Sequence, residues 1–324
     1  MTDARIIRIH ETGGPDVLTE DTIEVGAPGP AEVVVRNTAI GLNFIDTYHR
    51  TGLYPVELPF IPGTEGAGIV EAVGGDVTHI AEGDRVAYLA PGGAYATHSK
   101  LPAGSMVKIP DFVDDETAAA TFLKGLTAWM LLFEVFKARP GDTALIWAAA
   151  GGVGSLIVPW ARSLGVRVIG IVSTERKASR VLENGASDAV LATDDIVEKV
   201  KELTDGKGVD VAYDSVGKDS AEISLKCLRP RGWFVTYGNA SGPVDPIPPA
   251  RLGLAGSAVM TRPSLFDFVS TPEEISRGAA ALFGALRVGT IKAEIGQKYA
   301  LSEAAEAHRA LEARQTMGST VLLP

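Results

Sequence analysis

A glycine-rich turn between a buried strand and a helix constrains the fold of this chain more than any other feature. Residues 144–148 are apolar and strand-like, the turn reads Ala149-Ala150-Gly151-Gly152-Val153-Gly154, and residues 155–164 have a helical pattern. Glycines without a Cβ let a pyrophosphate approach the backbone, and the N–H groups at the start of the helix bind its charge. The turn therefore predicts a dinucleotide site, although alanine occupies the first position of the G-x-G-x-x-G pattern.

Strands and helices alternate beyond this turn. The first strand and five later candidates predict an α/β fold with a doubly wound parallel sheet of the Rossmann type. The five later candidates are Val166–Val172, Ala189–Leu191, Val209–Tyr213, Trp233–Tyr237 and Ala258–Thr261. Pro159 lies inside the first helix and is expected to kink it, because proline cannot donate the helical hydrogen bond.

The regions on either side have a different character. The first 120 residues or so contain many glycines and prolines and short alternating runs, which predict an irregular, mostly β domain, and a helix is predicted over 116–136. The tail is expected to pack back on this first domain. Its predicted elements are a helix over Pro272–Arg287, a segment Ile291–Tyr299, a helix over Ser302–Arg314 and a strand over Ser319–Leu323.

These patterns predict two domains, because 324 residues exceed what one hydrophobic core usually holds. The Rossmann domain, residues 125–263, is expected to be inserted in a discontinuous, mostly β catalytic domain of residues 1–124 and 264–324. The cleft between two such domains is the natural place for an active site.

Composition limits the partners and the compartment. A net charge of −10 disfavours nucleic acid and anionic lipid as main partners. Cys227 is the only cysteine, so no intrachain disulfide can form. Residues 143–161 carry no charge, but glycines, Ser155 and Pro159 interrupt them, and their neighbours fit a soluble sheet rather than a membrane span. The N-terminal residues lack the apolar core of a secretory signal, so we expect a cytoplasmic protein.

The end of the second strand indicates which dinucleotide binds. An NAD site places an Asp or Glu there to accept hydrogen bonds from the ribose, but this chain reads Val172-Ser173-Thr174, with Glu175 slightly late and Arg176 and Lys177 after it. Hydroxyls beside cations suit a 2′-phosphate, which favours NADP(H). The alternative is that Arg176 and Lys177 only begin a solvated helix.

Several motifs together resemble the zinc-independent quinone oxidoreductases of the medium-chain dehydrogenase/reductase superfamily. The resemblance covers essentially the whole chain in order, and it implies a GroES-like fold for the catalytic domain. The motifs that carry it are residues 41–48, 50–55, 62–68, 82–86, 148–154, 213–217, 237–239 and 261–264.

The resemblance also bears on metal use. Zinc alcohol dehydrogenases of this superfamily hold the catalytic metal with a Cys and a His, and the corresponding positions here are Asn43 and Thr64. Neither is a good zinc ligand, and the single carboxylate of Glu65 cannot hold zinc alone, so the sequence predicts a metal-free site. Four of the histidines, His49, His79, His98 and His308, have no ligand spacing and are interpreted as surface or packing residues.

The residues around the substrate follow from the resemblance. It implies that Asn43, Tyr48, Tyr54 and Lys124 form the donors and walls of the substrate site and that Thr127 lies near the nicotinamide. The tyrosines offer a flat face and an O–H, or they are partly buried core residues. Asp46 is interpreted as a residue that supports the loop in which it lies. Lys124 either stabilises a developing anion or anchors its helix through an ion pair.

The coenzyme residues are implied in the same way. The resemblance assigns the pyrophosphate to the turn and the 2′-phosphate to Ser173 and Lys177. The remaining coenzyme residues lie at strand ends or on the far side of the coenzyme. The full set is Ala150, Gly151, Gly152, Val153, Gly154, Ser173, Lys177, Ser215, Gly217, Tyr237, Asn239, Arg262 and Arg314. Two positions depart from the family: Pro159 replaces a glutamine, and Ala192 replaces a tyrosine that some relatives place against the adenosine phosphate.

The leading hypothesis is an NADPH-dependent, metal-free quinone reductase, because a quinone oxygen becomes a stabilised phenolate-like anion that a few hydrogen-bond donors can hold. A second hypothesis is a carbon–carbon double-bond reductase acting on enones or acyl thioesters. A third is a coenzyme-binding protein without turnover, like lens crystallins or RNA-binding relatives, and the acidic balance argues against RNA. The family resemblance implies a homodimer, through edge strands within Trp233–Met260.

Overall fold

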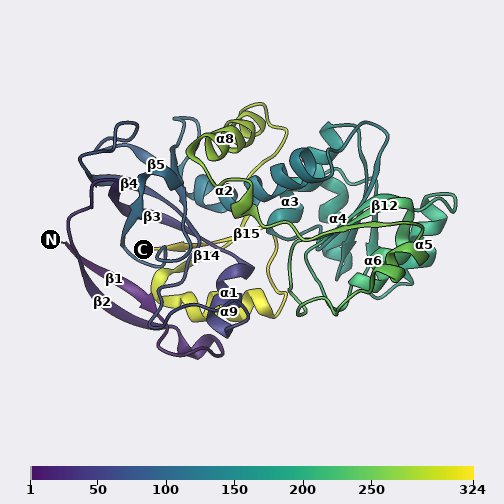
Figure 1. Cartoon of the computed structure of the whole chain (residues 1–324), viewed down its shortest axis with the longest axis horizontal. Coiled ribbons are helices and arrows are strands. Elements are labelled where there is room, and N and C mark those ends of the chain that lie inside the picture. The colour runs from purple at the N-terminus through teal and green to yellow at the C-terminus, as the bar shows by residue number, and fades with distance from the viewer. Residues whose placement is uncertain (1) are drawn as a thin grey trace. The chain divides into compact units, whose positions relative to one another are not determined.

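The computed structural model describes residues 2–324 and divides into two compact units (Figure 1). Of the described residues, unit 1 contains 2–126, 269–287 and 293–324, and unit 2 contains 127–268 and 288–292. The division predicted from sequence placed 125–126 in the second domain and both 264–268 and 288–292 in the first. In the structure, residues 125–126 belong to unit 1, whereas residues 264–268 and 288–292 belong to unit 2.

Unit 2 contains the predicted doubly wound sheet. Six parallel strands lie in the order β10-β9-β8-β11-β12-β13, so the order reverses direction at β8. In β8, Ala144, Leu145 and Ile146 are fully buried, as expected of a parallel sheet covered on both faces. The strands are β8 (Thr143–Trp147), β9 (Arg167–Val172), β10 (Asp188–Leu191), β11 (Val209–Asp214), β12 (Leu228–Thr236) and β13 (Val259–Thr261).

Helices connect the strands of this sheet. Because the sheet is parallel, the carboxyl ends of all six strands lie at one edge, where ligands bind in such folds. The helices are α3 (Gly152–Ser163), α4 (Glu175–Glu183), α5 (Ile196–Leu203), α6 (Ala221–Cys227) and α7 (Pro249–Leu254), with a 3-10 turn η4 (Leu265–Asp267).

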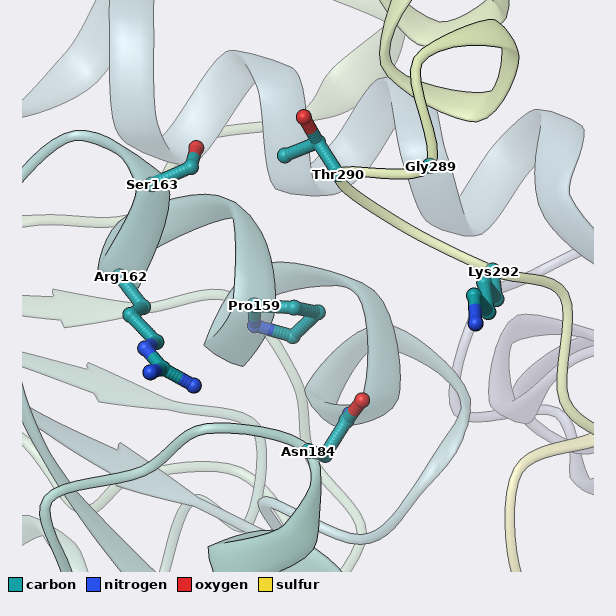
Figure 2. Close-up of a pocket in the computed structure, with 7 residues that line it drawn as sticks. All are labelled: Pro159, Arg162, Ser163, Asn184, Gly289, Thr290 and Lys292. Carbon is teal, nitrogen blue, oxygen red and sulfur yellow. The ribbon is translucent and has the colours of Figure 1, made fainter.

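Helix α3 continues from Gly152 to Ser163 through Pro159, the position at which the sequence predicts a kink. The proline leaves the Ser155 carbonyl without its helical donor, and Asn184 Nδ2 donates to that oxygen at 2.8 Å instead. Figure 2 shows Asn184 beside the part of α3 that carries Pro159. A side chain from beyond α4 therefore supplies the hydrogen bond that the proline removes.

Unit 1 is built on a seven-stranded sheet with the order β14-β15-β3-β4-β5-β7, and β6 pairs with β3. Strand β15 is antiparallel to β3 and parallel to β14, so the tail completes a sheet that the first hundred residues begin. This confirms the discontinuous, mostly β first domain. The strands are β3 (Glu32–Leu42), β4 (Glu65–Val73), β5 (Arg85–Leu89), β6 (His98–Pro102), β7 (Met106–Lys108), β14 (Ile295–Ala300) and β15 (Ser319–Leu323), with β1 (Thr2–Arg8) and β2 (Thr19–Val25) in a separate pair.

The helices of unit 1 include one that the sequence pattern did not predict. The sequence interpretation placed Asp46 in a loop, but residues 44–51 form α1, which is capped by Asp46 and followed by Gly52 with a φ of 81°. The helices are α1 (Phe44–Thr51), α8 (Pro272–Arg287) and α9 (Ala304–Glu312), with 3-10 turns η1 (Pro15–Val17), η2 (Ala103–Ser105) and η5 (Leu301–Glu303).

Helix α2 (Asp115–Trp129) continues into a π-helical segment, η3 (Met130–Val135), where one regular helix was predicted. The 21 residues from Asp115 to Val135 are long and apolar enough to cross a membrane by length and composition. However, 78% of the most apolar window is buried inside the protein, which is typical of a core helix.

Candidate active site and coenzyme-binding turn

The glycine-rich turn has the geometry of an anion cradle. Gly151 precedes α3 and forms no side-chain cap hydrogen bond, so the first N–H groups of the helix can bind an anion. A Cβ at Gly154 would clash with the carbonyl oxygens of Ala148 and Ala149. Ala149 fits at the first position because Gly170 faces it: a Cβ on Gly170 would come within 2.9 Å of the Ala149 methyl. The turn thus accepts this alanine and still fits a pyrophosphate.

The segment after β9 joins a hydroxyl, a helix N-terminus and a cation. Ser173 and Thr174 are exposed, and Thr174 Oγ1 accepts the Lys177 N–H at 3.3 Å as the cap of α4. Lys177 therefore lies in the first helical turn, where the helix dipole favours an anion. This arrangement suits a phosphate group bound between Ser173 and Lys177.

A buried carboxylate that the sequence did not reveal shapes the neighbouring strand end. Asp214 accepts hydrogen bonds from the N–H groups of Val216 and Gly217 at 2.8 and 3.0 Å and from the hydroxyls of Ser220 and Ser224, each at 2.7 Å. Burial raises the pKa of Asp214, against the lowering effect of these bonds. Asp214 thereby fixes the turn that carries the predicted residues Ser215 and Gly217.

The structure brings most of the predicted coenzyme residues to one edge of the sheet. The Ala240 N–H donates to the Ser215 carbonyl at 3.2 Å, which joins the turn after β11 to the loop with Tyr237 and Asn239. Arg262 Nη1 donates to the Thr236 carbonyl at 3.3 Å just beyond β13. Arg314 belongs to unit 1 and is not part of this group.

In unit 1, a buried carboxylate collects three donors. Glu65 is fully buried at the start of β4, and its Oε1 accepts from Lys124 Nζ at 2.8 Å and Asn43 Nδ2 at 2.9 Å. Its Oε2 accepts the Leu123 N–H at 2.6 Å. A Cβ on Gly41 would lie 2.5 Å from the Glu65 carboxyl carbon, so only glycine leaves room for this group. Asn43 and Lys124, predicted separately, are thus joined by Glu65, which the sequence indicated only as an insufficient zinc ligand.

A second buried network lies beside the first. Asp46 accepts from Thr64 Oγ1 at 2.7 Å, from the Asn43 N–H at 2.8 Å and from Tyr95 Oη at 3.3 Å. Burial raises the pKa of Asp46 to about 6, with the Thr64 and Asn43 hydrogen bonds acting in the opposite direction. Asp46 therefore holds the start of α1, as its interpretation as a supporting residue requires.

The Asp46 network extends to the C-terminal helix. Tyr95 Oη lies 2.9 Å from His308 Nε2, and His308 Nδ1 lies 3.4 Å from Arg50 Nη1. Arg50, only 1% exposed, forms two hydrogen bonds of 2.6 and 3.0 Å with Glu312. Burial, and secondarily the Arg50 charge, lowers the pKa of His308 to about 3. The imidazole is neutral, so Nδ1 accepts from Arg50 and Nε2–H donates to Tyr95.

The two predicted tyrosines lie together on the α1 side of unit 1. The rings of Tyr48 and Tyr54 pack edge to face with centroids 5.2 Å apart, and Tyr48 is only 7% exposed. Thr127 follows Lys124 by one turn of α2 and is counted in unit 2. The structure therefore groups Asn43, Tyr48, Tyr54 and Lys124 in one unit and carries Thr127 on the same helix as Lys124.

The donor chemistry around Glu65 does not suit a metal ion. In residues 2–324, no three His, Cys, Asp or Glu side chains gather into a group that could hold one. Where the superfamily resemblance places the metal ligands, the structure has the amide of Asn43, the hydroxyl of Thr64 and a Glu65 carboxylate already paired with an ammonium. The cation that Glu65 contacts is Lys124 Nζ.

A separate cavity of about 370 Å³ lies at the other end of α3. Figure 2 shows its lining, which comes from the end of that helix, the residue after α4 and the segment 288–292. Arg162 and Lys292 are its charged residues. Because the helix begins at the glycine turn and ends here, this cavity is not the coenzyme site.

The fold and the two sites define a class: a two-domain dehydrogenase with a GroES-like domain and a nucleotide-binding Rossmann domain. Two family models agree, one for the alcohol dehydrogenase GroES-like domain over residues 29–111 and one described as zinc-binding dehydrogenase over residues 152–289. The second description names a metal that the residues at the ligand positions of this chain do not fit.

Individual relatives narrow the class. A quinone oxidoreductase of Pseudomonas aeruginosa is 50% identical over 99% of this chain and 100% of its own length. A 2-haloacrylate reductase of Burkholderia is 47% identical over 98% of both chains. The crystal structure of Escherichia coli quinone oxidoreductase complexed with NADPH matches with a TM-score of 0.97 at 44% identity, covering 99% of this chain and all of that one. This chain belongs to the quinone oxidoreductase family of the medium-chain dehydrogenases/reductases.

Proposed function

We propose that this chain catalyses the NADPH-dependent reduction of quinones and that it does so without a metal. The observation that carries the metal-free part is the Lys124 ammonium, which is buried and held 2.8 Å from the Glu65 oxygen that also binds Asn43, one of the two residues that the resemblance sets at zinc-ligand positions. The full-length relatives named quinone oxidoreductase and the neighbour complexed with NADPH support the reaction and the coenzyme.

When bound, NADPH supplies a hydride, and a quinone that accepts it becomes a hydroquinone monoanion, which takes one proton from solvent. The protein has to bind the quinone and stabilise the negative charge on its oxygen. Lys124 is suited to that task because its charge is fixed in a buried site, where an electrostatic interaction is stronger than in water. Tyr48 and Tyr54 offer an aromatic surface for the quinone ring.

Asn43 has a different role from the one that the resemblance implies. Its Nδ2 donates to Glu65 at 2.9 Å and to the Gly41 carbonyl at 3.3 Å, so both amide protons are directed into the protein. We therefore assign Asn43 to holding Glu65 and assign the anion to Lys124. Thr127, one turn along α2, is retained as a residue near the nicotinamide.

On the coenzyme side, the turn of residues 150–154 would hold the pyrophosphate, and Ser173 with Lys177 would hold the 2′-phosphate. Ser215, Gly217, Tyr237, Asn239 and Arg262 would line the strand ends beside the adenosine and nicotinamide halves. Arg314 is proposed to complete the far side of the coenzyme. The absence of an acidic residue at the end of β9 favours NADPH over NADH, because a carboxylate there would repel the 2′-phosphate.

A second candidate function is the reduction of an activated carbon–carbon double bond. The 2-haloacrylate reductase relative, at 47% identity over nearly the full chain, favours it. The same Lys124 ammonium would stabilise an enolate oxygen or a carboxylate, so the chemistry of the site is compatible with both acceptors.

We also propose a cytoplasmic homodimer. Strand β13 is an edge of the unit 2 sheet, and nearby Leu254 and Val259 are 84% and 39% exposed, which fits pairing with a second copy. A single cysteine, Cys227, and a net charge of −10 fit a reducing compartment and disfavour nucleic acid and anionic membranes as partners.

Steady-state NADPH oxidation with 1,4-benzoquinone and 9,10-phenanthrenequinone, compared with a series of 2-alkenals and 2-haloacrylate, tests the proposal. We expect kcat/KM to be highest for the quinones. A higher value for the alkenals or 2-haloacrylate would favour the double-bond reductase instead.

A further inference from the structure

The Lys124 ammonium is buried but has only one hydrogen-bond partner among residues 2–324. The side chain is 6% exposed, and Nζ donates to Glu65 Oε1 at 2.8 Å. An ammonium carries three N–H donors, so two of them lack a protein acceptor. Buried donors without partners are costly, and in native structures they are usually satisfied by water or by a ligand.

Glu65 has the opposite character, since its carboxylate is surrounded by donors. Lys124 Nζ and Asn43 Nδ2 share Oε1, the Leu123 N–H bonds Oε2, and Gly41 provides the space for the group. Leu123 and Lys124 are neighbours on α2, so Glu65 binds the backbone and the side chain of the same helical segment. Such a carboxylate has little freedom to move, and it fixes the cation beside it.

We propose that Glu65 is a positioning residue for the reductase reaction: it holds the Lys124 ammonium at one place with its two remaining N–H groups directed at the acceptor oxygen. Asn43 and Gly41 serve the same purpose indirectly, by orienting Glu65 and by leaving room for it. The Glu65–Lys124 pair would then stabilise the oxygen anion, as a metal ion and its supporting carboxylate do in zinc enzymes. This inference rests on the proposed function for its choice of ligand, an oxygen anion on a flat conjugated ring.

A purely structural ion pair would explain the same distances, so the experiment has to separate position from stability. Glu65→Gln leaves a buried ammonium without its counter-charge, and either amide orientation sets the new NH2 group against a donor, so this variant is expected to lose stability as well as activity. The double variant Glu65→Gln with Lys124→Gln removes both charges and should recover much of the thermal stability. Lys108→Gln, which breaks the more exposed 2.7 Å pair with Asp84, is the matched control.

We expect the double variant to fold and bind NADPH like the wild type while its kcat with 1,4-benzoquinone stays roughly 100-fold lower, as for loss of an oxyanion donor. Glu65→Gln, assayed below its melting temperature, should lose roughly 10-fold or more in kcat, and Glu65→Asp should recover part of that loss. The control should keep the wild-type rate. A double variant that regains both stability and rate, or a Glu65→Gln variant with wild-type kcat, would overturn the inference.

A binding measurement separates this inference from the proposed function. The absorbance of 4-nitrophenolate, an aromatic oxygen anion, reports binding to the protein in the presence of NADP⁺ and needs no turnover. We expect Glu65→Gln and the double variant to bind it roughly 10-fold more weakly than the wild type and the Lys108→Gln control. Such a loss would support the positioning role even if no quinone is reduced, whereas equal affinity in all four proteins would refute it.

Discussion

Replacing His308 with glutamine should change how the stability of unit 1 depends on pH. Burial and the neighbouring Arg50 lower the pKa of His308 from 6.5 to about 3, so the unfolded chain binds a proton in this interval that the folded chain does not. Stability supplied by the neutral imidazole is therefore complete above pH 6.5 and is lost as the pH falls toward 3. The slope is about 1.4 kcal/mol per pH unit, or about 5 kcal/mol over the whole interval.

Asp46 acts in the opposite sense within the same network. Burial raises its pKa from 3.8 to about 6, so the folded chain binds the extra proton and gains stability as the pH falls from 6 to 3.8, by about 3 kcal/mol in total. The two slopes largely cancel in the wild type over this interval. His308→Gln retains an N–H for Tyr95 and an oxygen for Arg50 but does not titrate, so the Asp46 slope is no longer offset.

Urea unfolding of both proteins at several pH values between roughly 4 and 7 measures this effect. Far-UV circular dichroism is the suitable probe, because all four tryptophans, at positions 129, 147, 160 and 233, lie in unit 2. The variant should gain about 3 kcal/mol relative to the wild type between pH 6.5 and about pH 4, whatever its offset at neutral pH. Asp46→Asn should show the reverse trend. A difference between His308→Gln and wild type that does not vary with pH would refute the assigned neutral imidazole.

Three other substitutions test the coenzyme domain. Lys177→Ala should weaken NADPH binding by roughly 10-fold or more and leave NADH binding nearly unchanged in fluorescence titrations, and equal losses would contradict the 2′-phosphate role. Gly154→Ala should cost about 1–3 kcal/mol of stability, because its Cβ clashes with two carbonyl oxygens, and an unchanged melting temperature by tryptophan fluorescence would contradict this. Asn184→Ala should cost about 1 kcal/mol by leaving the Ser155 carbonyl unpaired. The same change in a Pro159→Ala background should cost much less, since the helix then supplies the missing N–H, and equal costs would show that Asn184 has another role.

The regular elements were the part of the fold that the sequence predicted well. Helix Pro272–Arg287 and strand Ser319–Leu323 begin and end where their patterns predicted. Their apolar residues recur with the period of the element that they form, and this is the strongest local signal of secondary structure. Helix α1 was missed, since its eight residues include Asp, Thr, Tyr and His, which have weak helix propensity, and its stability comes from the Asp46 cap and from packing. The π-helical end of α2 had no local signal either.

The candidate site also contains residues that the sequence predicted and residues that it did not. The glycine turn and the residues at the end of β9 could be proposed from the sequence because each is a run of consecutive residues. The buried networks were not, because their partners are distant in sequence: Glu65 and Lys124 are 59 residues apart, and Arg50 and Glu312 are 262 apart. Nothing in a local pattern indicates that Arg50 is buried or that Lys124 has one hydrogen-bond partner among residues 2–324. Those facts arise only when β4, α1, α2 and α9 are assembled.

The most direct test of the account is NADPH oxidation with 1,4-benzoquinone by protein that has been treated with a chelator and analysed for metals. We predict less than one zinc per ten chains, roughly, and a kcat that the chelator does not change, because the Lys124 ammonium replaces the metal in stabilising the anion. One tightly held zinc per chain, or activity that falls with chelation and returns with zinc, would contradict the metal-free mechanism. No turnover of any quinone with either coenzyme would contradict the proposed reaction itself.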